Sequence, residues 1–365
     1  MRNLSLPLLA ATALIVAMGL PRPTAACTTV LLEHEGRRLM AKSYDWDNGR
    51  GLLLHNKRGV AKRALLLDPA AVPANWTSAH ASLTFNQYGR ELPNGGINDA
   101  GLVVEIMWLK GSIYPPRDPR PALNELQWIQ YQLDRFARTA EVVAHAPSLR
   151  VAPVRGRVHY LVCDGTGDCA AMEYLDGELV VHGGTRLPFK ALTNHPYAEA
   201  RRRAEAHAGL GGKAAVPTGR SSHARFVRAA LAARRPPVVR GRDLLATTFA
   251  ILDDVAQGDR TRWQIVYDLS ARSVHFRTRD ARAIKTLRLA DLPPDCRTPV
   301  QMLSMDSARG GDVKARLLPF DGAANRALID HGMKRLGGAM GRLVGTIAAY
   351  PQTTRCALKA APVGR

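Results

Sequence analysis

The amino-acid sequence predicts an α+β fold, with strands and helices layered in one domain. Strand-like runs cluster near the N-terminus, helical patterns follow, and strand-like runs then return, without internal repeats or a convincing linker. Apolar residues make up 46% of the 365 residues, which is enough for a large core and excludes a disordered or collagen-like chain. A division into two domains is the weaker alternative. We therefore expect a single domain over residues 27–365.

The first 26 residues have the pattern of a secretory signal peptide. Arg2 precedes the apolar stretch Leu4–Leu20, and the following stretch Pro21–Ala26 ends in small residues. The apolar stretch is shorter than the roughly 20 residues of a membrane-spanning helix. Removal of residues 1–26 would accompany export to the periplasm or the medium, and it would make Cys27 the first residue.

Two other roles of the N-terminus stay open. An uncleaved membrane anchor is opposed by Pro7, which interrupts the apolar stretch. A lipid-modified cysteine, as in bacterial lipoproteins, is opposed by Thr24, because such signals normally carry an aliphatic residue three positions before the cysteine. No later stretch is comparably apolar, so we expect no integral membrane segment after processing.

The N-terminal half begins with a hairpin. Residues 28–34 and 37–44 are strand-like and flank the tight turn Glu35-Gly36. The strongest helical pattern of the chain covers residues 122–146, where apolar residues recur at helical spacing. Further strands of this half are expected at residues 83–88, 101–109, 157–163, 170–174 and 179–181.

The C-terminal half contains fewer regular patterns. Residues 209–219 are rich in Gly, Ala and Pro and predict a loop, which a helix over 222–233 follows. Residues 263–268 and 273–277 predict a second hairpin, and a helix is expected over 325–336.

The chain has five cysteines, an odd number for an exported protein. Cys163 and Cys169 flank a turn-rich loop between two strand-like runs, so a bridge across a hairpin is geometrically plausible. Cys296 and Cys356 both lie in the last quarter of the chain and are available for a second pair. Cys27 is then left over, as the one residue that processing would turn into a free α-amine bearing a thiol.

Composition and motifs exclude several classes of function. No phosphate-binding loop, zinc-protease motif, serine-hydrolase elbow or dinucleotide fingerprint occurs. Glu33-His34-Glu35 resembles a metal cluster, but on a hairpin turn alternate side chains face opposite ways, so solvated turn residues are the better interpretation. The net charge of +20 is spread over the whole chain without aromatic stripes, which argues against a nucleic-acid partner.

An N-terminal cysteine can act as a self-contained catalyst. Its thiol attacks an amide carbonyl, and its own α-amine, with a reference pKa near ~7.7, takes and returns the proton. Neighbouring cations would stabilise the thiolate, a carboxylate would orient the amine, and N–H groups would bind the oxyanion. The sequence therefore predicts an amide hydrolase with Cys27 as nucleophile.

Five segments resemble, in order and spacing, the choloylglycine hydrolase family, which comprises penicillin V acylases and bile salt hydrolases, with acid-ceramidase-like amidases as relatives. The resemblance extends from Cys27 to about Arg277 and implies the N-terminal nucleophile hydrolase fold, a four-layer αββα sandwich. It also implies hydrolysis of linear carbon–nitrogen amide bonds without a cofactor. The matching segments are Cys27-Thr28-Thr29, Lys42-Ser43-Tyr44-Asp45-Trp46, Gly96-Ile97-Asn98-Asp99-Ala100-Gly101-Leu102, Leu192-Thr193-Asn194-His195-Pro196 and Ser222-His223-Ala224-Arg225-Phe226.

The resemblance implies four catalytic roles beyond the peptide backbone. Cys27 falls on the family's nucleophile and Asp45 on the carboxylate near that nucleophile and its amine. Asn194 falls on the side-chain oxyanion donor, and Arg225 on the active-site arginine.

Two further positions bear on the branch of the family. Lys42, which we expect to be a further catalytic residue, stands where the family usually has arginine, so the charge is kept but the planar fork is lost. Trp108 falls where bile salt hydrolases typically have Asn, and its backbone N–H would be the second oxyanion donor. An aromatic residue there is more similar to the penicillin V acylases of Gram-negative bacteria.

The expected partner is a small N-acyl amide, with penicillin V, N-acyl homoserine lactones and conjugated bile salts as rival substrates. The aromatic residue at position 108 favours penicillin V or an acyl homoserine lactone over a rigid steroid. A lipid-anchored, non-catalytic envelope-binding protein is the alternative from another class, and a degenerate family member is a third. The sequence leaves a homo-oligomer open and predicts no metal site.

Overall fold

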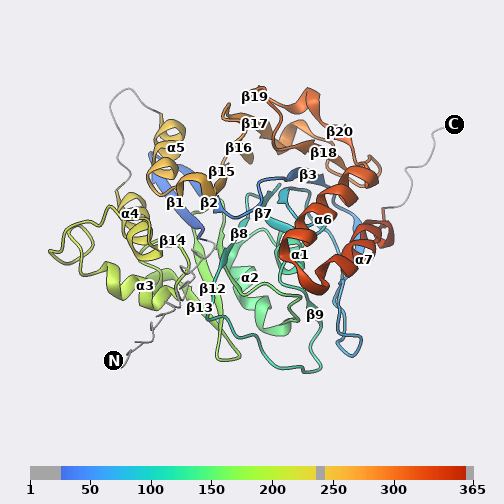
Figure 1. The fold of residues 1–365 in the computed structure, drawn as a ribbon, viewed down its shortest axis with the longest axis horizontal. Helices are drawn as coiled ribbons and strands as arrows, with labels where there is room; N and C mark the ends of the chain where they lie inside the picture. The colour runs from blue at the N-terminus through green and yellow to red at the C-terminus, as the bar shows by residue number, and fades with distance from the viewer. Residues whose placement is uncertain (1–25, 236–242, 359–365) are drawn as a thin grey trace, which may run out of the picture.

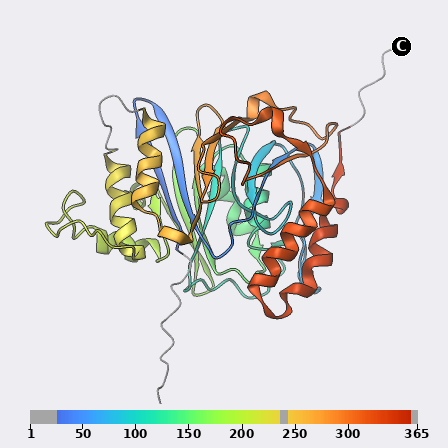
Figure 2. The ribbon, with the colours of Figure 1, turned by 45° about the horizontal axis from the view of Figure 1, so that its top comes forward.

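A computed structural model describes residues 26–235 and 243–358 of the chain. The predicted signal peptide, apart from Ala26, lies outside the described residues. Two large sheets stack face to face, with helices on their outer faces (Figures 1 and 2). The predicted α+β class is confirmed.

The first sheet has seven strands, antiparallel except for its last pair. Their order is β14 (Ala191–Leu192), β1 (Thr28–His34), β2 (Arg37–Asp45), β15 (Thr261–Asp268), β16 (Ser273–Thr278), β17 (Lys285–Arg288) and β19 (Gly311–Asp312).

The second sheet is antiparallel and has nine strands. Their order is β13 (Glu178–Gly183), β12 (Cys169–Leu175), β11 (Val158–Cys163), β8 (Val103–Trp108), β7 (Pro93–Asn98), β6 (Ser82–Asn86), β3 (Leu52–Asn56), β18 (Gln301–Ser304) and β20 (Leu318–Pro319). Smaller ladders join β9 (Ala122–Leu123) to β10 (Arg150–Val151), and β4 (Val60–Arg63) to β5 (Asn75–Thr77) and β21 (Arg355–Cys356).

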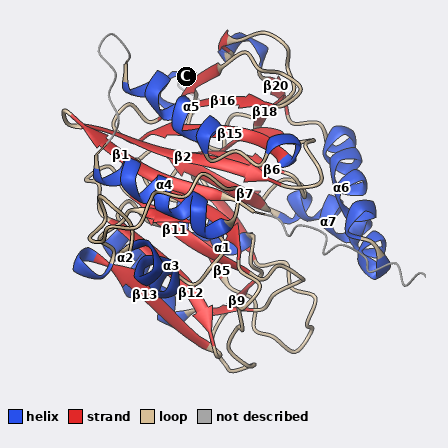
Figure 3. Ribbon diagram, turned by 60° about the vertical axis from the view of Figure 1, so that its left-hand side comes forward, coloured by secondary structure: helices blue, strands red, loops and turns tan. Residues whose placement is uncertain are grey.

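Three groups of helices complete the molecule. The seven-stranded sheet is covered by α4 (Ser222–Arg234) and α5 (Leu244–Asp254), with α3 (Tyr197–Ala204) against α4. The nine-stranded sheet is covered by α1 (Gln127–Arg135) and α2 (Thr139–His145). Helices α6 (Gly322–Leu336) and α7 (Val344–Ala349) lie together at one end of the molecule (Figure 3). The short 3₁₀ segments are Ala146–Ser148, Gly184–Arg186, Gly258–Arg260, Leu289–Asp291, Lys314–Arg316, Gly338–Leu343 and Tyr350–Thr353.

The hydrophobic core consists mainly of two large clusters, one between the sheets and one under the helices of the second sheet. Val30, Leu31 and Leu32 are all buried, because β1 has the second sheet on one face and α4 on the other. One large apolar cluster joins the two sheets to the helices over the first sheet. A second cluster lies under α1, around Trp128 and Tyr160, whose rings stack with centroids 4.2 Å apart.

Most predicted elements are present within one or two residues of their expected bounds, but the helix over residues 122–146 is wrong. Ala122–Leu123 forms a strand, and Asn124 Oδ1 accepts from the N–H groups of Leu126 and Gln127, which lets α1 begin at Gln127. Phe136 is extended and ends α1. Glu141 then accepts from the N–H groups of Ala137 and Arg138, so a separate helix begins at Thr139.

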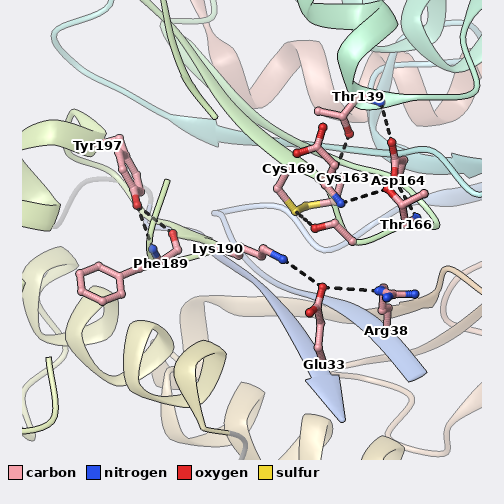
Figure 4. Close-up of a disulfide and its surroundings, with 12 residues drawn as sticks. Glu33, Arg38, Thr139, Cys163, Asp164, Thr166, Cys169, Phe189, Lys190 and Tyr197 are labelled. Carbon is pink, nitrogen blue, oxygen red and sulfur yellow. Dashed lines mark hydrogen bonds and ion pairs between the residues drawn. A yellow bond between two sulfur atoms is a disulfide. The ribbon is translucent and has the colours of Figure 1, made fainter. Parts of the chain in front are cut away.

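Two disulfides pair four of the five cysteines, as the loop geometry and the chain position favoured. Cys163–Cys169 closes the turn between β11 and β12, and Cys296–Cys356 joins the 296 loop to β21. Cys27 is the free cysteine of the described chain. Figure 4 shows the first bridge, with Glu33 bound by Lys190 and Arg38 nearby. Glu33 is therefore a surface ion-pair residue.

No helix among the described residues has the length and apolar character needed to cross a bilayer.

Candidate active site

The sheet register places Cys27 between two predicted site segments. Thr28 pairs with Ser43 of β2, and Thr29 pairs with Leu192 of β14, both antiparallel. Extending the first register by one residue and the second by two sets Cys27 opposite Tyr44 on one side and opposite Asn194 on the other. The residue directly before β1 thus meets positions 17 and 167 residues further along the chain.

Arg225 of α4 holds this start of β1 in place. The guanidinium is fully buried and donates to the carbonyl of Cys27 at 2.7 Å and to Thr28 Oγ1. Its other terminal nitrogen donates to Asn194 Oδ1 at 2.9 Å. One planar group therefore fixes both the nucleophile's backbone and the predicted oxyanion donor.

The orientation of the Asn194 amide follows from its two partners. Arg225 can only donate and the carbonyl of Trp108 can only accept, so Oδ1 faces the guanidinium and Nδ2 faces Trp108, at 2.8 Å. The Nδ2 group has a second proton, which these two bonds leave available. Asn194 is thus a prearranged N–H donor beside Cys27.

Trp108 presents its backbone polar groups on the same side. The N–H of Leu109 donates to the carbonyl of Arg157 at 2.8 Å, on the β11 edge of β8. Backbone groups alternate along a strand, so the N–H and carbonyl of Trp108 point to the other edge, where Asn194 binds the carbonyl. The predicted pair of oxyanion donors therefore lies together.

Asp45 lies at the end of β2, where its carboxylate is only half satisfied. Oδ1 accepts from Ser43 Oγ at 3.0 Å and from Thr261 Oγ1 at 2.6 Å, whereas buried Oδ2 has no hydrogen-bond partner in the described chain. Burial raises the pKa of Asp45 to about 6, against the lowering effect of these hydrogen bonds and of Arg225 and Lys42. A buried carboxylate oxygen without a hydrogen-bond partner would bind a nearby cation favourably.

Lys42 lies below the site in a separate buried network. Its ammonium is 3.0 Å from Glu105 Oε2 and also donates to the carbonyl of Ile106. Glu105 in turn accepts from Tyr267 Oη at 2.5 Å. Within the described ranges no hydrogen bond joins Lys42 to Cys27, but the charge of its ammonium lowers the pKa of the Cys27 thiol.

The thiol of Cys27 needs a base. The side chain is 3% exposed, and burial raises the pKa of the thiol more than the charges of Lys42 and Arg225 and the N–H of Asp45 lower it. At neutral pH the sulfur therefore carries its proton, and a nucleophilic thiolate forms only if a neighbouring group accepts that proton.

An apolar cavity of about 230 Å³ opens over Cys27. Trp46 and Trp108 form one side, with ring centroids 5.9 Å apart. Trp46 was not predicted as a site residue, although its place directly after Asp45 was a usable signal. Exposed Arg155 lies among the lining residues, and the remaining lining is mostly aliphatic.

The C-terminal helices supply the opposite wall, which sequence reasoning missed because no motif marks this region. This wall is made by side chains of α6, the 3₁₀ segment Gly338–Leu343 and α7. They are Met333, Leu336, Met340, Leu343 and Ile347.

Across residues 26–235 and 243–358, no three His, Cys, Asp or Glu side chains are grouped closely enough to hold a metal ion.

The chain is similar to known amide hydrolases. It is 27% identical to a penicillin V acylase of Pectobacterium atrosepticum over an alignment of 242 residues, and the match covers 55% of this chain and 64% of that relative. The matched region thus spans less than two thirds of the relative's length. No family model matches the chain.

Solved structures show the fold. A penicillin V acylase from Agrobacterium tumefaciens superposes with a TM-score of 0.71 at 25% identity, covering 81% of this chain and 98% of that one. A variant of the conjugated bile acid hydrolase from Clostridium perfringens superposes with a TM-score of 0.63 at 16% identity, covering 76% of this chain and 97% of that one. The resemblance to the choloylglycine hydrolase family and the four-layer αββα fold of the N-terminal nucleophile type are therefore confirmed.

Proposed function

We propose that the chain is an exported amide hydrolase that cleaves N-acyl small molecules, with the Cys27 thiol as nucleophile and its α-amine as general base. One arrangement carries the proposal: the buried Cys27 thiol and Trp108 line an apolar cavity, and the oriented Asn194 amide binds the Trp108 carbonyl beside them. The similarity to penicillin V acylases supports the same reaction class. The domain that performs it is proposed to be residues 27–365.

Acyl transfer to sulfur accounts for each group in this arrangement. The thiol proton moves to the α-amine of Cys27, and the sulfur attacks the substrate's amide carbon. The carbonyl oxygen becomes an oxyanion, which the free Asn194 N–H and the Trp108 N–H stabilise. The carbon–nitrogen bond then breaks, the proton passes to the leaving amine, and the acyl group remains as a thioester. Water attacks the thioester, and the thiol and a carboxylic acid are released.

The α-amine exists only after residues 1–26 have been removed. Asp45 Oδ2, buried and without a partner in the described chain, is the atom that we propose binds this amine and orients it toward the thiol. The half-satisfied carboxylate thus supports cleavage before Cys27 and, with it, a periplasmic or secreted enzyme. An acylated amine, as in a lipoprotein, would lose its basicity and with it this role.

The cavity indicates an apolar acyl group. The indole rings of Trp46 and Trp108 offer flat walls for a phenoxyacetyl ring, and the aliphatic side chains opposite suit an alkyl chain. Penicillin V and N-acyl homoserine lactones fit this description better than a rigid steroid, so bile salt hydrolysis is the alternative that a substrate panel tests.

The experiment begins with the intact mass of the exported protein. A mass that matches residues 27–365 supports the mechanism, whereas a diacylglycerol adduct or an unprocessed start contradicts it. The native protein should contain one alkylatable thiol without reductant, because the other four cysteines form disulfides.

Activity on penicillin V, a long-chain acyl homoserine lactone and glycocholate then tests the reaction. Cys27→Ala should lower kcat by several orders of magnitude without unfolding the protein. The double variant Cys163→Ala/Cys169→Ala is the control, since it removes sulfur atoms away from the cavity and should remain active. A Cys27→Ala enzyme with a tenth of the wild-type rate would refute the assignment, and glycocholate turned over tenfold faster than the other substrates would favour the bile salt alternative.

A further inference from the structure

The peptide unit between Thr193 and Asn194 is held at both ends. Its carbonyl accepts from His159 Nε2 at 2.7 Å, and its N–H donates to Ser222 Oγ at 3.0 Å. β14 ends at Leu192, so this unit lies outside the sheet ladder that would otherwise fix it. The position of the Asn194 amide therefore depends on these two side-chain contacts as well as on Arg225.

Both ring nitrogens of His159 face hydrogen-bond acceptors. Nδ1 lies 2.7 Å from Glu173 Oε1, and Nε2 faces the Thr193 carbonyl; the side chain is fully buried. A neutral imidazole donates from one nitrogen only, so both bonds form together only in the imidazolium state.

Glu173 is arranged to keep that state. Its carboxylate accepts from the Tyr197 N–H at the start of α3 and lies 3.5 Å from His182 Nε2. Burial alone would raise the pKa of Glu173, but the hydrogen bonds with His159 and Tyr197 and the nearby His182 imidazole lower its pKa to about 2. Glu173 is thus ionised at every pH at which the protein would work.

We propose that His159 and Glu173 are positioning residues: as a buried imidazolium–carboxylate pair, they hold the Thr193–Asn194 peptide unit so that the Asn194 amide meets the oxyanion formed at Cys27. The inference rests on the proposed function. It adds a chain of contacts from β11 and β12 of the second sheet to the oxyanion donor beside the first sheet.

Without a donor at Nε2 of His159, the Thr193 carbonyl would lose its partner, and the peptide unit would no longer hold the Asn194 amide in place. The titratable and charged groups around this pair are Glu173 on β12, His182 on β13, His195 after β14, Tyr197 on α3 and Arg225 on α4.

The test compares His159→Gln with His182→Gln in the mature enzyme. The His182 variant removes a partner of the same carboxylate but makes no contact with Thr193, so it controls for general loosening around Glu173. We expect His159→Gln to lower kcat about tenfold or more with little change in KM, and His182→Gln to stay within about twofold of wild type. Alkylation of Cys27 by iodoacetamide, which needs no oxyanion donor, should proceed at the wild-type rate in both.

Glu173→Gln provides a second measurement should His159→Gln fail to fold. The glutamine amide can donate to Nδ1, so a neutral imidazole keeps its Nε2–H bond to Thr193. This variant should therefore keep kcat within about threefold of the wild type.

Three results would overturn the inference: an unchanged kcat in His159→Gln, an equal loss of hydrolysis and of alkylation in that variant, or a loss of kcat of tenfold or more in Glu173→Gln. Each is distinguishable from failure of the proposed function, which would appear as an inactive wild type or an active Cys27→Ala enzyme.

Discussion

Asp45 combines a cost in stability with a role at the site. Its carboxyl group is buried, its Oδ2 has no partner within the described chain, and burial raises its pKa to about 6. The group therefore binds a proton more tightly when the protein is folded, so its favourable contribution is complete below the ordinary pKa of about 3.8 and is lost as the pH rises through 6. A shift of this size corresponds to about 3 kcal/mol.

This predicts a pH-dependent difference between the unprocessed chain and its Asp45→Asn variant. The free energy of unfolding of the wild type should fall by about 3 kcal/mol relative to the variant between pH 3 and pH 7, because only the carboxyl group ionises. Denaturant unfolding at several pH values measures the difference. Asp47→Asn is the control, since Asp47 is exposed and paired with Arg260. Parallel pH curves for wild type and Asp45→Asn would contradict the prediction.

A substitution of Arg225 tests whether the site needs the planar geometry of the guanidinium or only its positive charge. Arg225→Lys keeps the cation near Cys27, but a single ammonium cannot bridge the Cys27 carbonyl, Thr28 Oγ1 and Asn194 Oδ1 as the guanidinium does. We expect kcat to fall about 100-fold, the scale of losing one oxyanion donor. Arg228→Lys, one turn away on α4 and paired with Asp254, should leave kcat within about twofold. Equal rates in the two variants would show that charge alone is required.

The wall formed by Met333, Leu336, Met340, Leu343 and Ile347 is the element-scale feature with the clearest functional consequence. Met333 and Leu336 lie on α6, and Gly337 and Gly338, whose φ angles are 70° and 60°, turn the chain between α6 and the helical segments that carry the other three residues. Tyr350 then anchors the following residues by donating to the Arg63 carbonyl at 2.8 Å.

Filling the cavity from this wall should discriminate between acyl chains. Leu336→Trp would exclude about three methylenes, which at about 0.8 kcal/mol each corresponds to a loss of roughly 50-fold in kcat/KM. The loss should appear with a long-chain acyl homoserine lactone and be under threefold with a four-carbon chain. Leu318→Trp, at an exposed position that does not line the cavity, is the control. A uniform loss over all chain lengths would place the wall outside the acyl site.

Elements defined by local signals were predictable from the sequence. The first hairpin follows from Glu35-Gly36, where both residues have positive φ, and α4 begins after Ser221, whose side chain accepts from the Ala224 N–H. The helix predicted over residues 122–146 was wrong because apolar spacing continues through a break that polar contacts create. At that break, Asn98 Nδ2 of strand β7 donates to the carbonyls of Leu133 and Phe136.

The site was predictable only as far as its motifs extend. The structure brings Cys27, Asp45, Asn194, Arg225 and Trp108 together, while their catalytic roles remain predictions. The partner of Lys42 was not predictable, because Glu105 lies in the other sheet, and neither was His159, which no motif marks. Contacts between sheets depend on packing that single-sequence periodicity does not record.

At the scale of the whole molecule, charge is the dominant property. The net charge is +20, and removal of residues 1–26 with Arg2 and Arg22 leaves +18. Much of the acidic minority is already engaged, as in the pairs Arg228–Asp254 and Arg277–Asp253. The unbalanced cations therefore produce a positive field that extends into solvent and raises the local concentration of anions.

Arg155 contributes positive charge at the cavity itself. It is exposed, lies among the lining residues, and forms no ion pair with any residue that the structure describes. Penicillin V bears a carboxylate, whereas an acyl homoserine lactone is neutral, so the two substrates separate electrostatic attraction from the fit of the acyl group. The Debye length falls from about 10 Å at 0.1 M salt to about 3 Å at 1 M.

We therefore expect kcat/KM for penicillin V to fall several-fold between 0.02 and 0.5 M NaCl, and that for the neutral lactone to change by less than twofold. Arg155→Gln should reduce the salt dependence for penicillin V, because Arg155 is the one Lys or Arg residue among the described residues that line the cavity. Arg157→Gln is the matched control: the residue is also exposed, but it does not line the cavity, and its side chain donates to the Lys110 carbonyl. Salt-independent rates on penicillin V would show that the positive field does not contribute to substrate capture. Equal salt dependence in the two variants would show that the overall charge of the molecule, and not Arg155 in particular, attracts the substrate.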